Sequence, residues 1–329
     1  MTAKIYYDQD AHLDQLSDRS IGLIGYGNQG QAHALNLRDS GLSVWVGSRA
    51  DSPARERSQK DGFAVHTIGE VVQNCDVLAI MLPDEAIPSV YEEHIEPYLQ
   101  PRATFVFAHG FVVRHKTIRL GDSVDVVLIA PTGPGRQLRS LYQEGRGLPA
   151  LVAVDQDVSG EAWTRCLAYA KGIGCTRAGV VKTTFEEETV TDLFCEQAVL
   201  CGGIPQLIKA AFDTLVEKGY QPELAYISCL KEVKLIADLL FASGIDGMRE
   251  AISTTAKYGS AVAGPRVITG ATQEAMAGIL SDIENGSFAK SFLSDAKEGA
   301  PIINKILSEE KASRLAQVGR ELHEALDFA

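Results

Sequence analysis

Six residues near the N-terminus have the spacing of a dinucleotide-binding turn. The segment follows the apolar run Ser20–Gly25 and opens a helical pattern over Gln29–Ser40. In such a turn the first glycine permits a tight bend, the second lets the backbone approach a pyrophosphate, and the third lets helix and strand pack closely. The helix N-terminus then offers unpaired N–H groups to the phosphates. We therefore expect a dinucleotide to contact Gly25, Tyr26, Gly27, Asn28, Gln29 and Gly30.

The residues after the next predicted strand help to distinguish NADPH from NADH as the bound dinucleotide. Ser43–Gly47 is followed by Ser48, Arg49, Ala50, Asp51 and Ser52. This strand end contacts the adenosine ribose in dinucleotide-binding folds, and an acidic residue there favours NAD. Arg49 and Ser52 instead suit a 2′-phosphate, because a guanidinium and a hydroxyl both bind its oxygens, whereas Asp51 favours a free ribose. We expect NADPH, with NADH as the alternative.

Two carboxylates in the second half have spacing that suits a metal ion. Asp192 and Glu196 lie four residues apart in a helical pattern, so both side chains point to one face. Carboxylate oxygens are the hard ligands that Mg²⁺ prefers. The alternative interpretation is a solvated acidic helix end, because Glu186, Glu187 and Glu188 precede the pair.

A single histidine stands where the cofactor half would place a catalytic group. His109 directly follows the predicted strand Thr104–Ala108. Reactive groups and nicotinamide contacts lie at the carboxyl ends of strands in such folds. A structural histidine with satisfied hydrogen bonds is the alternative.

The two halves of the chain have different patterns. Short β-rich runs separated by helical segments predict a parallel sheet, with strands at Ser20–Gly25, Ser43–Gly47, Val77–Leu82, Thr104–Ala108, Val124–Ala130 and Leu151–Val154. The second half reads as helices, at Thr184–Leu200, Pro205–Lys218, Glu223–Phe241, Ile245–Ala256, Thr272–Glu284 and Ser308–Asp327. We predict an α/β dinucleotide-binding domain over residues 1–182 and an all-α domain over residues 183–329.

The composition of the chain disfavours some classes of binding partner. The 329 residues carry a net charge of −12, which disfavours nucleic acid and anionic membranes. No run of about 18 apolar residues and no signal-peptide pattern is present, so we expect no membrane span and a cytoplasmic protein. The six cysteines form no Cys-x-x-Cys pair, so we expect reduced thiols and no structural zinc.

An ordered set of motifs resembles one family. The segments GYGNQGQAHALNLRDSG, IMLPDE, FAHGF, IAPTGPG, YAKGIGCTRAGV, TDLFCEQAVLCGG and YGSAVAGPRVI occur in that order. Over residues 1 to about 325 the chain is similar to the short form of ketol-acid reductoisomerase. The resemblance implies a Rossmann-like N-domain and a knotted helical C-domain. It also implies NADPH and two magnesium ions, and a homodimer or higher homo-oligomer in which two chains share each active site.

The resemblance also implies roles for particular residues. Asp192 would bridge two metal ions and Glu196 would bind one of them, while Glu232 (metal) and Ser253 would come from the partner chain. The cofactor would further contact Leu82, Pro83, His109 and Gly135. His109 and Thr132 would lie at the catalytic centre together with these carboxylates.

Several positions depart from the family pattern. Ser228 stands where a second metal-binding carboxylate is expected, and Thr132 where a lysine holds the substrate. Threonine cannot replace the charge of that lysine. Ser228 and Thr132 are smaller than the residues they replace, which suggests a larger substrate. The positive charges added at Arg136, Lys231 and Lys257 suggest that this substrate is anionic.

The departures lead to a hypothesis with two alternatives. We expect a diverged reductase that acts on a C=O, C=N or activated C=C bond and has weakened isomerisation, with one magnesium site retained and the second doubtful. The first alternative is an authentic magnesium-dependent ketol-acid reductoisomerase of branched-chain amino-acid biosynthesis. The second is a protein that binds NADPH without catalysis.

Overall fold

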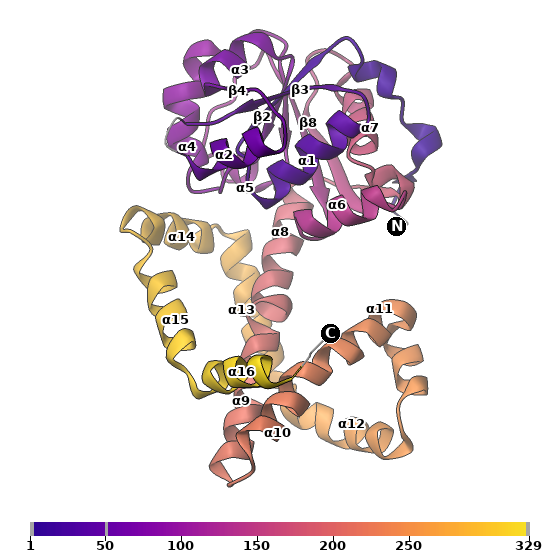
Figure 1. Cartoon of the computed structure of the whole chain (residues 1–329), viewed down its shortest axis with the longest axis vertical. Helices are drawn as coiled ribbons and strands as arrows, with labels where there is room; N and C mark the ends of the chain where they lie inside the picture. The colour runs from indigo at the N-terminus through magenta and orange to yellow at the C-terminus, as the bar shows by residue number, and fades with distance from the viewer. Residues whose placement is uncertain (1–2, 50–51, 327–329) are drawn as a thin grey trace. The chain divides into compact units, whose positions relative to one another are not determined.

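The computed structural model describes residues 3–49 and 52–326, and the chain divides into two compact units between Thr191 and Asp192 (Figure 1). The sequence placed the boundary after residue 182. Helix α8 (Phe185–Cys195) runs through the point of division, so each unit is described by itself.

The first unit is built on one sheet. Within the described residues its nine strands are β1 (Ile5–Tyr6), β2 (Ser20–Ile24), β3 (Ser43–Gly47), β4 (Val65–His66), β5 (Val77–Ile80), β6 (Thr104–Phe107), β7 (Asp125–Pro131), β8 (Ala150–Gln156) and β9 (Val180–Lys182). They are ordered β1-β9-β8-β7-β6-β5-β2-β3-β4. The order reverses direction beside β2, so the turn after β2 lies at a topological switch point.

Most of the sheet is parallel, as the alternating pattern predicted. Six of the eight strand pairings are parallel, while β7–β8 and β1–β9 are antiparallel. Pro131 at the end of β7 pairs with Ala150 at the start of β8. The chain therefore leaves and re-enters the sheet at the same edge, which the sequence did not reveal.

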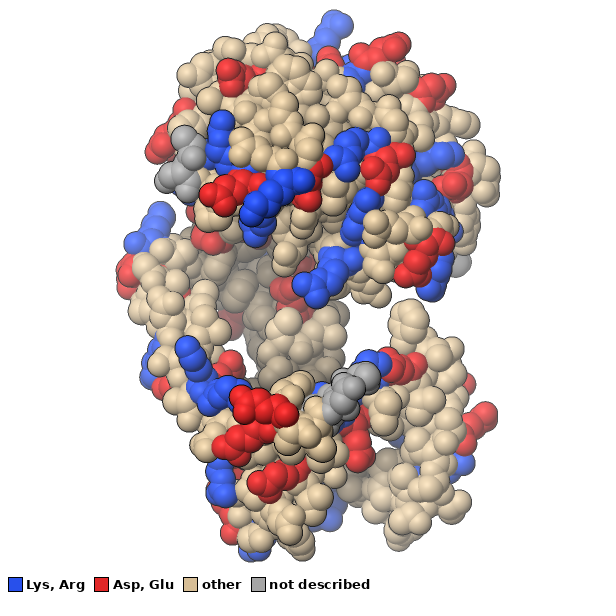
Figure 2. Space-filling model, viewed as in Figure 1, with Lys and Arg blue, Asp and Glu red and all other residues tan. Residues whose placement is uncertain are grey.

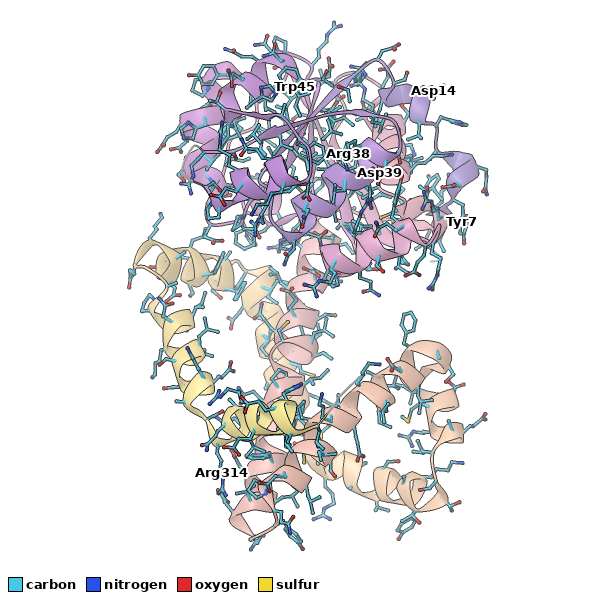
Figure 3. The ribbon with its side chains drawn as sticks, in the orientation of Figure 1. Tyr7, Asp14, Arg38, Asp39, Trp45 and Arg314 are labelled. Atoms are coloured by element: carbon cyan, nitrogen blue, oxygen red, sulfur yellow. The ribbon has the colours of Figure 1, made fainter. Side chains whose placement is uncertain are left out.

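Helices pack against this sheet and enclose its core. They are α1 (Asn28–Asp39), α2 (Pro53–Lys60), α3 (Ile68–Asn74), α4 (Ile87–Val90), α5 (Phe111–Arg114), α6 (Gly135–Gln143) and α7 (Ala162–Gly172). The central strands read as unbroken apolar runs because they are buried on both faces. Figure 3 labels Arg38 on α1, which lies over the Phe63 ring, and Trp45 on β3, which stacks on His66.

The second unit is helical, as predicted. Beyond α8 it contains α9 (Gly203–Glu217), α10 (Pro222–Tyr226), α11 (Glu232–Ala251), α12 (Thr254–Val267), α13 (Gly270–Glu284), α14 (Ser287–Lys297), α15 (Pro301–Ala312) and α16 (Arg314–Ala325). A π-helical turn follows α8 over Glu196–Leu200, and another precedes α11 over Ile227–Lys231. The knot stays a prediction.

Two helix predictions in this unit were wrong. The stretch Ile245–Ala256 is not one helix, because Ser253 caps α12 by accepting a hydrogen bond from the Ala256 N–H. Ser308–Asp327 is likewise divided at Ser313, which caps α16. The predicted helix Glu223–Phe241 is confirmed, and it contains the π turn Ile227–Lys231. Serine side chains compete for backbone donors, so they end helices that apolar periodicity alone continues.

The second unit buries few of its apolar side chains. Its described core cluster contains Phe212, Ala225, Tyr226, Val318 and Leu322. Helices α11 and α12 extend away from α9, α10 and α16 in Figure 1 instead of wrapping around them. Large apolar side chains on this unit are therefore exposed, most strongly Phe241 at 92%.

One helical stretch has the length and hydropathy of a membrane span, although the sequence predicted no such span. Among the described residues, Phe185–Glu217 is long and apolar enough to cross a membrane by length and composition alone. The stretch is interrupted by the π turn and by Cys201-Gly202, and it carries Asp192 and Glu196. One such helix is weak evidence for a membrane span.

Charges of both signs are interspersed over the face of the first unit seen in Figure 2. No extended basic surface is visible on that face.

Candidate active site

The glycine-rich turn has the geometry that its sequence predicted. Gly25 adopts φ +99°, a conformation that favours glycine, and turns the chain from β2 towards α1. A Cβ on Gly30 would lie 2.2 Å from the Gly25 carbonyl oxygen, so this glycine permits the close packing of α1 on the turn. A Cβ on Gly27 would meet no atom within 4 Å. The second glycine therefore leaves open space at the N-terminus of α1, where a pyrophosphate fits.

The side chain of Tyr26 supports this turn from behind. It is buried, and its hydroxyl donates a hydrogen bond of 2.8 Å to Asp61. Burial, followed by the hydrogen bond to Asp61, raises the pKa of Tyr26 above its usual value. Only the backbone of Tyr26 is left to face a phosphate.

A second helix begins beside the turn. A Cβ on Gly135, the first residue of α6, would lie 2.0 Å from the Asn28 carbonyl oxygen. Gln29 donates a hydrogen bond of 2.9 Å to the Gly133 carbonyl. The N-termini of α1 and α6 therefore lie together, and both contribute partial positive charge to the same place.

A cavity lies at the end of β3, where the adenosine end of a dinucleotide is expected. Its volume is about 570 Å³, and Ser48 and Arg49 line it together with residues of α3. Arg49 is exposed, whereas the Ser52 hydroxyl accepts a hydrogen bond from the Ala54 N–H and caps α2. Asp51, which favours NAD, lies outside the described residues.

His109 and an aspartate follow neighbouring strands. Ile80 at the end of β5 pairs with Phe107 at the end of β6. The two loops that follow therefore leave the sheet side by side, and His109 Nδ1 lies 3.0 Å from the Asp84 carboxylate. Leu82 and Pro83, predicted cofactor contacts, lie between β5 and Asp84.

A buried glutamate, predicted to belong to a solvated acidic run, links α8 to the loop of His109. Glu188 is only 2% exposed, and it accepts a hydrogen bond of 2.8 Å from the Gly110 N–H. Beside it, Glu186 accepts two hydrogen bonds from Arg114, of 2.7 and 2.9 Å. The solvated interpretation was therefore wrong for Glu188. Its position four residues before Asp192, on the same helical face, was the signal in the sequence.

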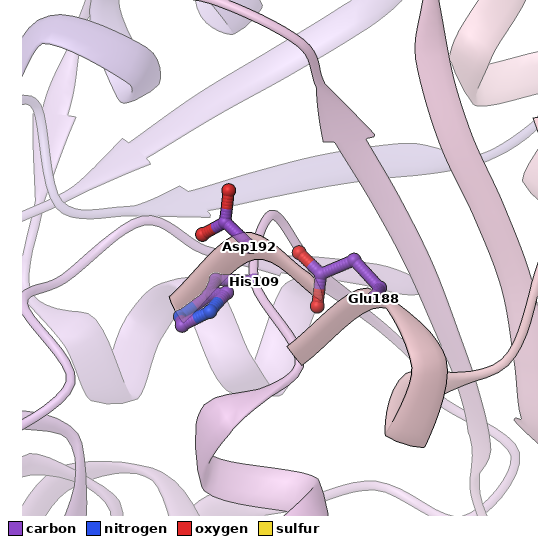
Figure 4. A group of neighbouring side chains, drawn as sticks. All are labelled: His109, Glu188 and Asp192. Carbon is purple, nitrogen blue, oxygen red and sulfur yellow. The ribbon is translucent and has the colours of Figure 1, made fainter. Parts of the chain in front are cut away.

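Three of these side chains form a group that could hold a cation. One ligand atom each of His109, Glu188 and Asp192 lies within 4.8 Å of the others, and Figure 4 shows the three side chains gathered around the start of α8. Asp192 is exposed and lies one turn beyond Glu188 on α8. Two carboxylates and an imidazole are suitable ligands for a divalent cation.

The remaining predicted metal-binding and catalytic residues of the second unit lie at helix ends and in π turns. Glu196, exposed, begins the π turn after α8, and Ser228 lies in the π turn before α11. Exposed Glu232 is the first residue of α11. The Ser253 hydroxyl caps α12, accepting a 3.2 Å hydrogen bond from Ala256. π turns are frequent at functional sites, and here one adjoins each predicted metal-binding pair.

Thr132 lies on the turn between β7 and α6. Its hydroxyl donates a hydrogen bond of 2.9 Å to the Pro149 carbonyl of the same loop region. The Thr132 N–H donates to that same oxygen, also at 2.9 Å. The side chain is therefore engaged with the backbone, and it offers no positive charge to a substrate.

Comparisons with known proteins agree with this geometry. Residues 15–179 match the model of the acetohydroxy acid isomeroreductase NADPH-binding domain, and residues 185–328 match that of the ketol-acid reductoisomerase C-terminal domain. An NADH-preferring ketol-acid reductoisomerase from an uncultured archaeon is 40% identical, with 98% of this chain and 99% of that chain covered and a TM-score of 0.95.

More distant structures share the fold alone. A semialdehyde dehydrogenase NAD-binding protein from Cupriavidus necator is 18% identical, with 82% of this chain and 99% of that chain covered and a TM-score of 0.63. A Plasmodium falciparum pyrroline carboxylate reductase is 13% identical, with 82% of this chain and 98% of that chain covered and a TM-score of 0.52. The two family models together span both units, and the dinucleotide turn has its expected geometry. The chain therefore belongs to the ketol-acid reductoisomerase family and is an NAD(P)H-dependent oxidoreductase.

Proposed function

We propose that this protein is a diverged member of its family, which retains hydride transfer to an anionic biosynthetic substrate and has weakened isomerisation. The observation that carries the proposal is the hydrogen bond of Thr132 to the Pro149 carbonyl. The position at which the family pattern has a substrate-holding lysine is neutral and engaged with its own loop. Ser228 removes a second charge, from the predicted metal site.

The described residues fit both expected cofactors. The open space at Gly27 accepts a pyrophosphate, and the exposed carboxylate of Asp192 suits a hard cation. When bound, the nicotinamide would supply a hydride and magnesium would polarise substrate oxygens. We propose Asp192 and Glu196 as ligands of one magnesium ion. Glu232 from a partner chain would contribute to a second site that Ser228 weakens.

The residues of the first unit have distinct tasks in this reaction. The N-termini of α1 and α6 would bind and orient the pyrophosphate. His109 would exchange a proton with the reduced oxygen of the acceptor, because it follows the strand end at which the nicotinamide is expected. Glu188 holds the backbone of Gly110, the next residue, and so keeps this loop in place.

We propose NADPH as the cofactor because of the position of Arg49. This exposed guanidinium lines the cavity at the end of β3, where it can bind a 2′-phosphate. The relative at 40% identity is described as NADH-preferring, which supports the alternative. An Arg49→Ala variant should weaken binding of NADPH by about tenfold or more and leave binding of NADH nearly unchanged. Equal losses for both cofactors would argue against a 2′-phosphate site.

A second copy of the chain is the proposed partner, in the cytoplasm. Phe241 on α11 and Tyr258 on α12 are strongly exposed, and so are Ile302 and Leu307 on α15. Exposed apolar surface of this extent marks an interaction site. Pairing through the second unit would cover these helices and would bring Glu232 and Ser253 to the partner's first unit, as the resemblance implies.

Two substrates separate the steps of the family reaction. 2-Acetolactate needs alkyl migration and reduction, whereas 3-hydroxy-3-methyl-2-oxobutyrate has its alkyl group already moved and needs the hydride alone. We expect NADPH oxidation with the second compound at a rate at least about tenfold above that with the first, in the presence of Mg²⁺. Oxidation with neither compound, while NADPH still binds, would point to a different acceptor.

An authentic ketol-acid reductoisomerase is the second candidate. The 40% identity over 98% of the chain favours it. Magnesium-dependent turnover of both compounds at similar rates would select this candidate over the diverged reductase.

A further inference from the structure

A polar cavity lies at the amino edge of the sheet, where the parallel strands begin. Its volume is about 640 Å³, and its lining includes Arg19 before β2, Asp76 before β5 and Arg102 before β6. Strands β2, β5 and β6 are parallel, so these residues lie at the edge opposite to the glycine-rich turn that follows β2. The cavity is therefore separate from the place where the pyrophosphate of a dinucleotide is expected.

The carboxylates that line this cavity already have partners within the protein. Asp76 accepts a hydrogen bond of 3.0 Å from the Ser20 N–H and lies 4.0 Å from Arg19. Glu161 accepts a hydrogen bond from Arg165 and lies 3.7 Å from Arg19. Neither carboxylate needs a ligand to balance its charge.

The guanidinium groups of the cavity are less fully engaged. In residues 3–49 and 52–326, the Arg102 side chain has neither a hydrogen bond nor an ion pair, and that of Arg19 makes only the two long ion pairs. Arg165 is 5% exposed, and its terminal nitrogens donate to Asp125 and Glu161. Its buried Nε has no hydrogen-bond partner in the part of the chain that the structure describes. The charged groups of the cavity thus leave donors unused, which suits an anion.

The backbone of Arg102 is unusual for a residue with a side chain. Its φ is +67°, in the left-handed region that favours glycine. Its N–H donates a hydrogen bond of 2.8 Å to the Ser123 carbonyl, which holds this conformation. Disfavoured backbone conformations are concentrated at functional sites, and here one carries a guanidinium that lines a cavity.

We propose that this cavity binds a small dicarboxylate anion, whose two carboxylates pair with Arg19 and Arg102. A planar guanidinium matches a carboxylate through two parallel hydrogen bonds. Asp76 and Glu161 also line the cavity, so they repel an anion whose charge is concentrated at one centre, such as inorganic phosphate. A dicarboxylate divides its charge between two groups, and a cavity of about 640 Å³ is large enough for it.

Calorimetric titration of the full-length protein with succinate and with glutarate measures this binding, with inorganic phosphate as the comparison anion. Because Gln73 on α3 also lines the cavity at the end of β3, each titration is made with and without saturating NADP⁺. We expect saturable binding of a dicarboxylate with a Kd of about 1 mM or lower, unchanged by NADP⁺, and at least about tenfold weaker binding of phosphate. Absence of saturation, equal affinity for phosphate, or a Kd raised about tenfold by NADP⁺ would overturn the proposal.

Two variants test the assigned arginines. Arg102→Gly and Arg19→Gln should each weaken dicarboxylate binding at least about tenfold. Glycine adopts the backbone conformation of residue 102 without strain, so Arg102→Gly should keep the thermal stability of the wild type. Arg146→Gln is the matched control, because Arg146 is 70% exposed and lies outside the cavity in the same unit.

Unchanged binding in Arg102→Gly, or an equal loss in Arg146→Gln, would contradict the assignment. The titrations do not depend on turnover of any substrate. Their outcome is therefore independent of whether the proposed function holds.

Discussion

The two units differ in how much of their own apolar surface they bury. The first unit encloses a continuous core on the sheet, in which Leu23, Val106 and Ile129 are fully buried. The second has a small described cluster around Phe212 and leaves Phe241 almost completely exposed. A unit with its own core can position a site by itself, as the dinucleotide turn illustrates. We propose that the second unit completes its packing and its part of the site against a second copy of the chain, because its apolar side chains are exposed.

The largest expected effect comes from a charge on the exposed face of the second unit. Phe241→Glu should abolish pairing, because a carboxylate in a buried apolar interface is strongly disfavoured. Activity should fall at least about 1,000-fold, since Glu232 and Ser253 would no longer reach the partner's site. Sedimentation velocity and NADPH oxidation measure the two effects.

Val158→Glu is the control for this substitution, on a similarly apolar but less exposed position of the first unit. It should leave assembly and activity unchanged. A dimeric and active Phe241→Glu variant would show that α11 does not form the interface.

The next effect concerns a buried ion pair in the first unit. Arg165 on α7 lies 2.8 Å from Asp125 on β7, and both side chains are almost completely buried. Arg165→Met leaves a buried carboxylate without its cation, so it should lower the free energy of unfolding by about 3–5 kcal/mol. Denaturant unfolding measures this loss.

An exposed pair in the second unit provides the contrast. Lys234 and Asp238 on α11 are 77% and 61% exposed. Lys234→Met should have no measurable effect, because exposed pairs contribute little. Equal losses for the two variants would mean that the units do not differ as described.

Two glycines of the dinucleotide turn separate packing from binding. Gly30→Ala should destabilise the first unit by about 1–3 kcal/mol, because its Cβ would overlap the Gly25 carbonyl. Gly27→Ala should leave stability nearly unchanged and still weaken NADPH binding, because its Cβ enters open space meant for phosphate. Thermal unfolding and NADPH titration check both. A strong loss of stability in Gly27→Ala would contradict the assigned roles.

The last prediction concerns the pH dependence of the first unit's stability. His33 on α1 is fully buried, with Nδ1 3.0 Å from the Tyr169 hydroxyl, and burial lowers its pKa to about 3. The unfolded chain therefore binds a proton near pH 6.5 that the folded unit does not bind. The stability that comes from keeping His33 neutral is therefore fully present well above pH 6.5. It declines as the pH falls, and the free energy of unfolding is lower by about 2 kcal/mol at pH 5. In His33→Gln the free energy of unfolding should depend less steeply on pH between pH 6.5 and 5, as measured by denaturant unfolding. An unchanged slope would mean that other groups cause the pH dependence.

Local features of the fold could be predicted from the sequence. The turn from Gly25 to Gly30 depends on neighbouring residues only, and its strand and helix formed where the pattern placed them. The short strands β1, β4 and β9 were missed because they contain only two or three residues, too few for a periodic pattern. The π turns were missed because a helix was assumed to keep one period throughout.

The candidate site was harder to predict from the sequence than the fold, because it depends on tertiary contacts. The burial of Glu188 results from its hydrogen bond to Gly110, 78 residues away in the sequence. The contact of Asp84 with His109 likewise requires β5 and β6 to be neighbours. A run of three glutamates looked uniform in sequence, yet only Glu188 is buried while Glu186 and Glu187 face solvent.

The most direct test of the account restores the two lost charges. The kcat/KM values of 2-acetolactate and 3-hydroxy-3-methyl-2-oxobutyrate would be measured with Mg²⁺ in the wild type and in a Thr132→Lys/Ser228→Glu variant. The account predicts that the variant raises the ratio of isomerisation-dependent to simple reduction by at least about tenfold, because charge returns where migration needs it. A wild-type ratio already near one, unchanged in the variant, would contradict the proposed divergence.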